Sequence, residues 1–416
     1  MGAWTVAVIA TTFLVPVPAA TTPSAAPVPC PYQSLPSIPP TPPATIRTAG
    51  GPLWGGDQLG GTGLAVPSGV AAPPAVAATT WVVADLDSGA VLAACGAHVR
   101  RRPASVQKLL LAATALPLLP PDQVVEATPE DLALPSDSSA VGLLVGGKYP
   151  VSTLWYGLLL QSGNDAANAL ARMAGGPGGI AAGVAAMNAE AYRLGAEDTH
   201  ASNPHGLDEP DQFTSAYDLA LIARADFARE DFVRYDTLDR MQWPAQPPRD
   251  PTGYQIQNEN QLLKNYPGAL GGKTGFTDQA RHTYVGAAQR NGRRLVVTLM
   301  GAEVVPFGRT WKQASMLLDW AFAVPSAAQV GHLVTPDEVT RERTPPTPSA
   351  APGPHGTAAG PASPVSDFGS AWGILGALIA LAVAVLGLAV VKVVALARRR
   401  RSRYRRRAQG APVRDV

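Results

Sequence analysis

Proline is distributed unevenly along this chain, and its placement limits where a packed domain can form. The 41 prolines concentrate in residues 16–74 and again in residues 336–364. Because proline fixes its own φ angle and donates no backbone hydrogen bond, segments this rich in proline are predicted to be extended or disordered. Roughly 250 residues remain between them, which is enough for a single hydrophobic core.

This pattern divides the chain into predicted segments. Residues 79–325 are predicted to form the folded domain. A Pro/Ala-rich arm, residues 21–78, precedes the domain, and a stalk of similar composition, residues 326–371, follows it. Residues 1–20 are apolar and end in small residues, which is typical of a signal peptide, although no Lys or Arg precedes the apolar stretch.

The order of patterns within the domain indicates its architecture. The stretch Thr79–Cys95 has strand character and is broken at residues 87–89, which predicts a β-hairpin. Residues 150–225 are predicted to be mostly helical. Strands return from Gly271, and Asn291-Gly292 is a strong hairpin-turn signal. We therefore expect one antiparallel sheet built from both ends of the domain, with a helical lobe inserted between them.

The net charge of +2 conceals an acidic body with a basic tail. Lys392–Val416 holds ten basic residues and one acidic residue, so the rest of the chain carries 23 basic and 30 acidic residues, a net charge of −7. An acidic body argues against nucleic-acid binding. Trp372–Val391 is twenty residues without a charge, about the length that a helix needs to cross a bilayer. We predict a transmembrane helix at 372–397, a cytoplasmic tail at 398–416 and a folded domain outside the cell membrane.

The two cysteines also bear on whether the domain lies outside the cell. Cys30 lies in the Pro-rich arm and Cys95 at the end of a predicted strand. Outside the cell a disulfide between them is possible and would attach the arm to the domain. Two unpaired, buried thiols are an equal alternative from the sequence alone. No cysteine or histidine cluster has the spacing of a metal site, and His200 and His205 fit no zinc pattern.

Ser105 and Lys108 begin an otherwise apolar helix, and their spacing suggests chemistry. Residues at i and i+3 share one face of a helix. A serine hydroxyl is a weak nucleophile that needs a base. A lysine can be that base only when its amine is neutral, and burial and a nearby positive charge both favour the neutral form. A single Ser-x-x-Lys is nevertheless a weak signal, because it occurs by chance in many proteins.

Two further motifs make the Ser-x-x-Lys signal more specific. Ser162-Gly163-Asn164 lies between two predicted helices, and Lys273-Thr274-Gly275 opens a predicted strand. Ser-x-x-Lys, Ser-x-Asn and Lys-Thr-Gly in this order resemble the motifs of the serine penicillin-recognising enzymes. Each motif is weak alone, but the ordered set in the required structural context is specific.

The stretches around these motifs resemble the D-alanyl-D-alanine carboxypeptidases of the low-molecular-mass penicillin-binding protein group. The resemblance covers about Thr79 to Val324 and omits the arm, the stalk and the tail. It implies an α/β fold of the penicillin-binding-protein and β-lactamase type, with an antiparallel five-stranded sheet, flanking helices and an all-helical lobe. It also implies a peptidoglycan stem peptide ending in D-Ala-D-Ala as substrate, β-lactams as covalent inhibitors, and no metal or organic cofactor.

The resemblance assigns roles to the motif residues. Ser105 would be the acylated nucleophile, Lys108 its base, and Ser162 the relay of a proton to the leaving D-alanine. Asn164 would hold the substrate's peptide amide, and Thr274 would bind the terminal carboxylate. Lys273 would be a second positive charge facing the site, which would help keep Lys108 neutral.

Two backbone N–H groups and one arginine complete the predicted site. The N–H groups of Ser105 and of Phe276, which follows Gly275, would form the oxyanion hole. Phe276 departs from the polar residue frequent at this position in the family, but only its N–H is needed. Arg309 matches an arginine that draws in the carboxylate; the alternative is a solvated residue at a helix start.

Other residues near the motifs are assigned structural roles. Asp165 is expected to be a helix-start residue, His205 to shape a loop, and Trp155 and Tyr156 to belong to the core. Among rival functions, a class A β-lactamase needs a Glu-x-x-Leu-Asn stretch, which this chain lacks. A D,D-endopeptidase and a penicillin or wall-fragment sensor without turnover share the three motifs and stay open.

Overall fold

The computed structural model describes residues 2, 28–31, 53–304 and 308–344. The predicted membrane span and basic tail lie outside these residues, as does the predicted signal peptide apart from Gly2. Among the helices in the described ranges, none combines the length and the apolar composition needed to cross a bilayer.

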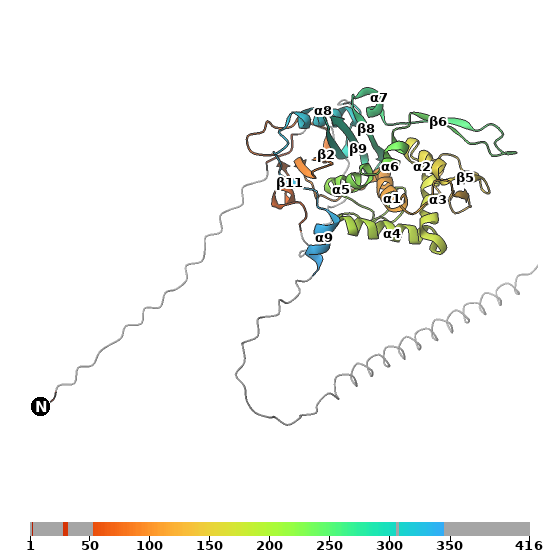
Figure 1. Ribbon diagram of the computed structural model, residues 1–416, viewed down its shortest axis with the longest axis horizontal. Helices are drawn as coiled ribbons and strands as arrows, with labels where there is room; N and C mark the ends of the chain where they lie inside the picture. The colour runs from red at the N-terminus through yellow and green to blue at the C-terminus, as the bar shows by residue number, and fades with distance from the viewer. Residues whose placement is uncertain (1, 3–27, 32–52, 305–307, 345–416) are drawn as a thin grey trace, which may run out of the picture. The chain divides into compact units, whose positions relative to one another are not determined.

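One antiparallel sheet forms the centre of the domain (Figure 1). Its strand order is β1-β3-β2-β10-β9-β8, and β11 also pairs with β3. The strands are β1 Leu64–Ala65, β2 Ala78–Asp85, β3 Ala90–Cys95, β8 Ala269–Thr277, β9 Arg281–Arg290, β10 Arg293–Ala302 and β11 Gly331–His332. The five longer strands match the five-stranded sheet that was predicted, and the two-residue strands β1 and β11 add to it at the β3 edge. Two small hairpin sheets lie apart from it: β4 Val124–Glu126 with β5 Lys148–Pro150, and β6 Arg240–Trp243 with β7 Tyr254–Gln257.

The two predicted hairpins are present, and the residues of their turns explain them. Asp85 accepts hydrogen bonds from the N–H groups of residues 87 and 88, and Gly89 has φ 79°, which closes the β2–β3 turn. Asn291 and Gly292 have φ 51° and 78° between β9 and β10. A positive φ at both central residues is the type I′ geometry that Asn-Gly favours.

Helices cover both faces of the sheet. Within the described residues they are α1 Gln107–Ala115, α2 Val151–Leu160, α3 Asn164–Gly175, α4 Gly179–Leu194, α5 Ala216–Phe227, α6 Glu230–Asp236, α7 Gln261–Asn265, α8 Thr310–Ala323 and α9 Pro336–Arg343. Figure 1 shows α8 and α5 on opposite sides of the sheet. Along β2, Val82 and Ala84 join the core on the α5 side, while Trp81 and Val83 join the core on the α8 side. Successive strand residues point to opposite faces, so a strand buried on both faces is apolar throughout.

The folded unit is longer at both ends than the predicted domain, residues 79–325. Cys30 and Cys95 form a disulfide with their Cα atoms 5.8 Å apart, which attaches the described part of the arm to β3. Trp54 is buried, and residues 331–343 form β11 and α9 on the body. The proline-based boundaries missed these segments because each buries only a few apolar side chains within a Pro-, Gly- and Ala-rich context.

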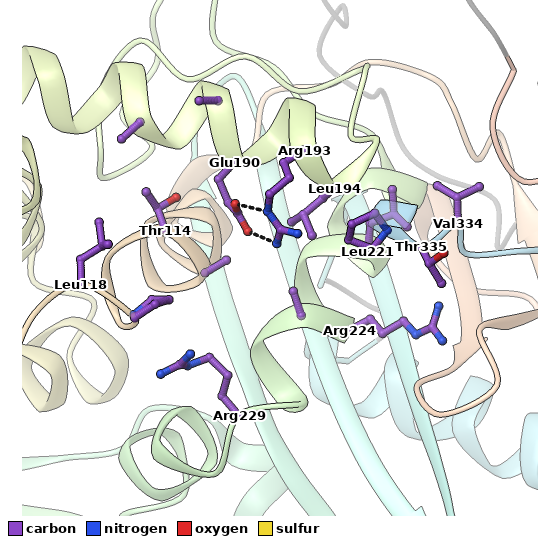
Figure 2. Close-up of a pocket in the computed structure, with 16 residues that line it drawn as sticks. Thr114, Leu118, Glu190, Arg193, Leu194, Leu221, Arg224, Arg229, Val334 and Thr335 are labelled. Carbon is purple, nitrogen blue, oxygen red and sulfur yellow. Dashed lines mark hydrogen bonds and ion pairs between the residues drawn. The ribbon is translucent and has the colours of Figure 1, made fainter. Parts of the chain in front are cut away.

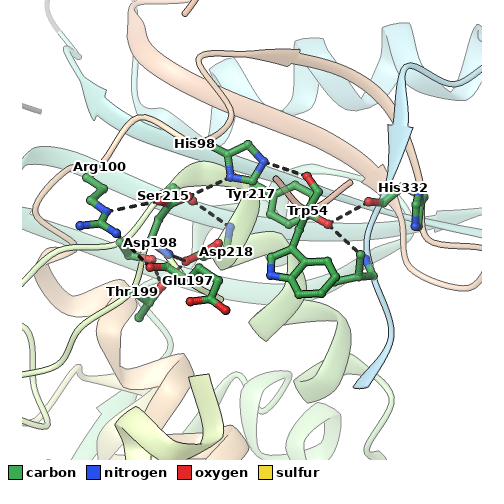
Figure 3. Close-up of polar contacts among 12 residues, drawn as sticks. Trp54, His98, Arg100, Glu197, Asp198, Thr199, Ser215, Tyr217, Asp218 and His332 are labelled. Carbon is green, nitrogen blue, oxygen red and sulfur yellow. Dashed lines mark hydrogen bonds and ion pairs between the residues drawn. The ribbon is translucent and has the colours of Figure 1, made fainter. Parts of the chain in front are cut away.

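A polar cluster joins both added segments to the body (Figure 3). The His98 ring lies 2.8 Å from Asp198 Oδ2 through Nδ1 and 3.1 Å from the Trp54 carbonyl oxygen through Nε2. Tyr217 of α5 donates a hydrogen bond of 2.9 Å to the carbonyl oxygen of His332 in β11. These contacts hold residues 53–65 and 331–344 to the core of the domain.

Candidate active site

A cleft of about 1390 Å³ runs along the free edge of β8 and brings most of the predicted site residues together. Seven of the nine line it: Ser105, Ser162, Asn164, Thr274, Gly275, Phe276 and Arg309. The other two, Lys108 and Lys273, are buried. Residues from four segments far apart in the sequence therefore converge on one cavity.

Ser105 and Lys108 occupy the start of a helix, as the sequence predicted. Ser105 lies in the 3₁₀ turn η2, Ala104–Val106, and Lys108 in the first turn of α1. Lys108 Nζ lies 2.9 Å from Ser105 Oγ. Ala104, the residue before Ser105, has φ 49°. Its carbonyl oxygen lies so close to Gly206 that a Cβ at residue 206 would be 1.8 Å from it. A glycine is thus required opposite the nucleophile's turn.

The surroundings of Lys108 favour its neutral form. Its side chain is fully buried. Burial lowers the pKa of Lys108 well below its usual value, and the neighbouring Lys273 ammonium lowers this pKa further. Asp165 and Glu259 act in the opposite direction.

Lys108 Nζ contacts three oxygen atoms, and in the neutral form that burial favours it can accept the hydroxyl proton of Ser105. Its Nζ donates to Asn164 Oδ1 at 2.7 Å and to the carbonyl oxygen of His205 at 2.8 Å. A neutral amine has two N–H groups and one lone pair, and these two acceptors use both N–H groups. The lone pair remains for the hydroxyl proton of Ser105, which is the arrangement that a general base requires.

Ser162 and Asn164 belong to the turn between α2 and α3. Ser162 has φ 59°, which is uncommon for a residue other than glycine. Its Oγ is buried and has no hydrogen-bond partner among the described residues. Asn164 begins α3, and its backbone N–H donates to Ser139 O at 2.9 Å. An unpartnered hydroxyl facing a cleft is available to a ligand, because burying it unsatisfied is costly.

The Lys-Thr-Gly motif lies on β8, which pairs with β9 along one side only. Lys273 is buried, and its Nζ donates to the carbonyl oxygen of Thr274 at 2.9 Å. Burial lowers the pKa of Lys273 to about 8, while Glu259 and Asp236 counteract this effect. A Cβ on Gly275 would lie 2.8 Å from the backbone N of Ser105. The motif therefore needs glycine at this position so that β8 can approach the nucleophile.

Phe276 and Arg309 lie at the mouth of the cleft. The Phe276 ring is 49% exposed and lies against the His282 ring, with centroids 4.6 Å apart. Arg309 is exposed and immediately precedes α8. Both positions suit the predicted roles, and the roles themselves stay predictions.

Two residues that the sequence assigned to structure have structural contacts. Asp165 accepts hydrogen bonds of 2.9 Å from the N–H groups of Val141 and Leu143, which holds the loop before α2 against the start of α3. His205 shapes its loop, but its carbonyl oxygen also holds Lys108. Sequence reasoning missed this role because a backbone acceptor leaves no residue-type signal. It also missed Glu259, whose effect on both lysines depends on tertiary contacts.

A second hollow of about 740 Å³ lies away from these residues, between α1, α4, α5 and residues 334–336 (Figure 2). Its wall is largely apolar, and its Arg193 is paired with Glu190. It holds none of the predicted site residues.

The site places the Ser105 hydroxyl beside a buried lysine, with a second serine whose hydroxyl has no partner among the described residues and a second buried lysine beside an edge strand; this arrangement suits a serine acyl-transfer enzyme. Comparisons with known proteins give the family. The D-alanyl-D-alanine carboxypeptidase model (peptidase S11) matches residues 68–304. The chain belongs to this family.

Individual relatives agree with this assignment. The chain is 45% identical over 270 residues to D-alanyl-D-alanine carboxypeptidase DacB2 of Mycobacterium tuberculosis, covering 64% of this chain and 90% of that protein. A crystal structure of D-alanyl-D-alanine carboxypeptidase from M. tuberculosis H37Rv has a TM-score of 0.60 at 44% identity, covering 65% of this chain and all of that one. The Streptomyces K15 DD-transpeptidase has a TM-score of 0.57 at 27% identity, covering 61% of this chain and all of that one.

Proposed function

We propose that Ser105 is the nucleophile with which this D-alanyl-D-alanine carboxypeptidase removes the terminal D-alanine of peptidoglycan stem peptides. Ser105 Oγ–H gives its proton to neutral Lys108, and Oγ attacks the carbonyl carbon of the penultimate D-alanine. The C–N bond breaks, the leaving amine takes a proton through Ser162, and free D-alanine departs. Water then hydrolyses the acyl-enzyme and restores Ser105.

The observation that carries this proposal is the hydrogen bonding of Lys108. Two of its three contacts are to oxygens that only accept, Asn164 Oδ1 and the His205 carbonyl, and the third is to Ser105 Oγ. An amine that is fully buried beside a second lysine is a base at neutral pH, not a surface ammonium.

The binding roles follow from the lining of the cleft. Asn164 and Thr274 are proposed to hold the substrate's peptide amide and its terminal carboxylate, and Arg309 to attract that carboxylate to the mouth. The N–H groups of Ser105 and Phe276 are proposed to stabilise the oxyanion, each contributing about 3 kcal/mol to transition-state binding. A β-lactam acylates Ser105 by the same attack, but its leaving nitrogen stays attached to the acyl group and does not depart.

The test uses the full chain and diacetyl-Lys-D-Ala-D-Ala, with free D-alanine as the readout. We expect release by the wild type, loss of release in Ser105→Ala, and retained release in Ser138→Ala. Ser138 is a matched control because it lines the same cleft while its Oγ donates to Pro135 O. Fluorescent penicillin should label the wild type and the control but not Ser105→Ala.

The alternatives give different results. Penicillin labelling without D-alanine release would favour a D,D-endopeptidase or a sensor without turnover. Release by Ser105→Ala at the wild-type rate would refute the assignment of the nucleophile.

We also propose that the catalytic domain works on the outer side of the cell membrane, anchored through Trp372–Val391. The support is the uncharged length of that segment, the arginines that follow it, and the Cys30–Cys95 disulfide, a bond that persists in oxidising compartments. The full chain should sediment with membranes, and a chain ending after residue 344 should not. Equal sedimentation of the two chains would refute the anchor.

A further inference from the structure

Two buried carboxyl groups lie behind the active site, and the proposed mechanism uses neither. Asp226 is in the last turn of α5, and Asp236 is the last residue of α6. Both side chains are fully buried. Among the described residues, neither carboxylate oxygen of Asp226 has a hydrogen-bond partner, and Asp236 Oδ1 has none either. Buried polar groups without partners are uncommon, so this pair needs an explanation.

Asp236 is connected to the active-site strand. Its Oδ2 accepts a hydrogen bond of 2.5 Å from the backbone N–H of Gly272, the residue before Lys273. The approach is so close that a Cβ on Gly271 would lie 2.1 Å from Asp236 Oδ2. The strand is irregular at this point, because its register with β9 shifts between Ala269 and Gly271. Asp236 therefore fixes the backbone of β8 just before the segment that lines the cleft.

Asp236 also provides negative charge near Lys273. Its charge raises the pKa of Lys273, which burial has lowered to about 8. The other contributor is Glu259, which is exposed in the cleft. Solvent and salt screen an exposed charge much more than a buried one. Glu259 has the larger effect on the pKa of Lys273, but Asp236 is the buried counter-charge, which salt screens less.

The surroundings decide which of the two carboxyl groups is ionised. Burial raises the pKa of Asp226 well above its usual value, and Asp236 raises it further, followed by Glu190; Arg229 acts in the opposite direction. Burial also raises the pKa of Asp236, to about 7, but the Gly272 N–H and Lys273 limit the rise.

Two tyrosines on neighbouring elements also face this region. Tyr284 of β9 donates its hydroxyl to Asn260 Oδ1, and Tyr156 of α2 faces Tyr235. Of the two carboxyl groups, Asp236 is therefore the one that ionises at the lower pH.

We propose that Asp236 is a positioning residue of the active site: a buried counter-charge that holds the Gly272–Lys273 backbone in place and keeps the Lys273 ammonium charged at neutral and mildly alkaline pH. The inference rests on the proposed role of Lys273 as the second positive charge of the site. It extends that role to a residue that does not touch the cleft.

The experiment compares Asp236→Asn with Asp226→Asn in the full chain. Asparagine keeps an oxygen for the Gly272 N–H and removes only the charge at residue 236. The readout is the rate of Ser105 acylation by penicillin between pH 6 and pH 10, with D-alanine release from the diacetyl tripeptide measured alongside. We expect the alkaline limb of Asp236→Asn to move down by ~1 pH unit, because one nearby opposite charge shifts a buried pKa by at least that much. Asp226→Asn should keep the wild-type profile because Asp226 is not among the charges that act on the pKa of Lys273.

Salt separates the two contributors to Lys273. The shift caused by Asp236→Asn should persist in 1 M NaCl, whereas the shift caused by Glu259→Gln should shrink. In Asp236→Asn, kcat for the peptide should fall more than KM rises at pH 8, since a neutral Lys273 no longer lowers the pKa of Lys108, the proposed base.

The outcomes are distinct. An unchanged alkaline limb in folded Asp236→Asn, or equal shifts in Asp226→Asn and Asp236→Asn, would overturn the inference. If Asp236→Asn does not fold, Asp236→Ser removes the same charge with a smaller side chain and is read in the same way. A wild-type chain that is neither acylated nor releases D-alanine would overturn the proposed function itself and this inference with it, and that result needs no variant.

Discussion

Replacing Gly275 by alanine tests how closely β8 must approach the nucleophile. The added Cβ would lie 2.8 Å from Ser105 N and 2.4 Å from Thr283 Oγ1. Thr283 cannot easily turn away, because its Oγ1 donates to Pro103 O at 2.8 Å. Ordinary contact begins at 3.4 Å, so the separation must grow by about 0.6 Å at Ser105 and about 1.0 Å at Thr283.

This displacement is large compared with the tolerance of an oxyanion hole. Its donors act at about 2.7–3.1 Å from the developing oxyanion, and loss of one costs about 3 kcal/mol, or about 10²-fold in rate. We therefore expect Gly275→Ala to slow acylation of Ser105 by about 10²-fold. The loss should fall mainly on kcat, because the displaced N–H groups act in the transition state.

The assay is single-turnover acylation by penicillin, with the melting temperature as a check on folding. Gly61→Ala is the matched control: Gly61 has φ −80°, and the nearest atom to a Cβ there is 3.9 Å away. It should keep the wild-type rate. Acylation at the wild-type rate by folded Gly275→Ala would refute the close approach of β8 to Ser105 N as a requirement of the reaction.

Three further predictions concern stability and binding. Burial lowers the pKa of His205 to about 3 in the fold, so its stabilising contribution is present above pH 6.5 and is lost as the pH falls towards 3. At pH 5 the loss of stability is about 2 kcal/mol. His205→Gln should therefore lose less melting temperature between pH 7 and pH 5 than the wild type, and equal losses would contradict this prediction. The Cys30–Cys95 disulfide joins residues 65 apart, so its reduction should lower the free energy of unfolding in denaturant titrations by up to about 4 kcal/mol. Reduction should leave the acylation rate unchanged. A large loss of rate would show that the disulfide acts on the active site. Because Arg309 is exposed, Arg309→Ala should raise KM for the peptide by no more than about fivefold. The variant should not change KM for a peptide whose terminal carboxylate is amidated. An equal effect on the amidated peptide would refute the proposed binding of the carboxylate by Arg309.

Much of the fold followed from local signals in the sequence. Asn291-Gly292 has the conformational freedom that a two-residue hairpin turn needs, so a strand pair around it was predictable. Strand β2 was predictable from its run of Thr, Trp and Val residues, which favour strands. The ends of the domain were not predictable, because Trp54 and α9 are stabilised only by contacts with the rest of the folded domain.

The sequence by itself determined which side chains we propose to carry the chemistry and in which order they occur. Ser105 and Lys108 share a helix face at any placement of that helix, and Gly275 follows its lysine and threonine in any strand. Only the tertiary structure decided the charge state of Lys108 and the partners of Lys273. The pKa of a lysine depends on what excludes water from it and on charges from other segments. For Lys108 these charges are Lys273, Asp165 and Glu259, and for Lys273 they are Glu259 and Asp236. Those are long-range contacts, and no local pattern of residues encodes them.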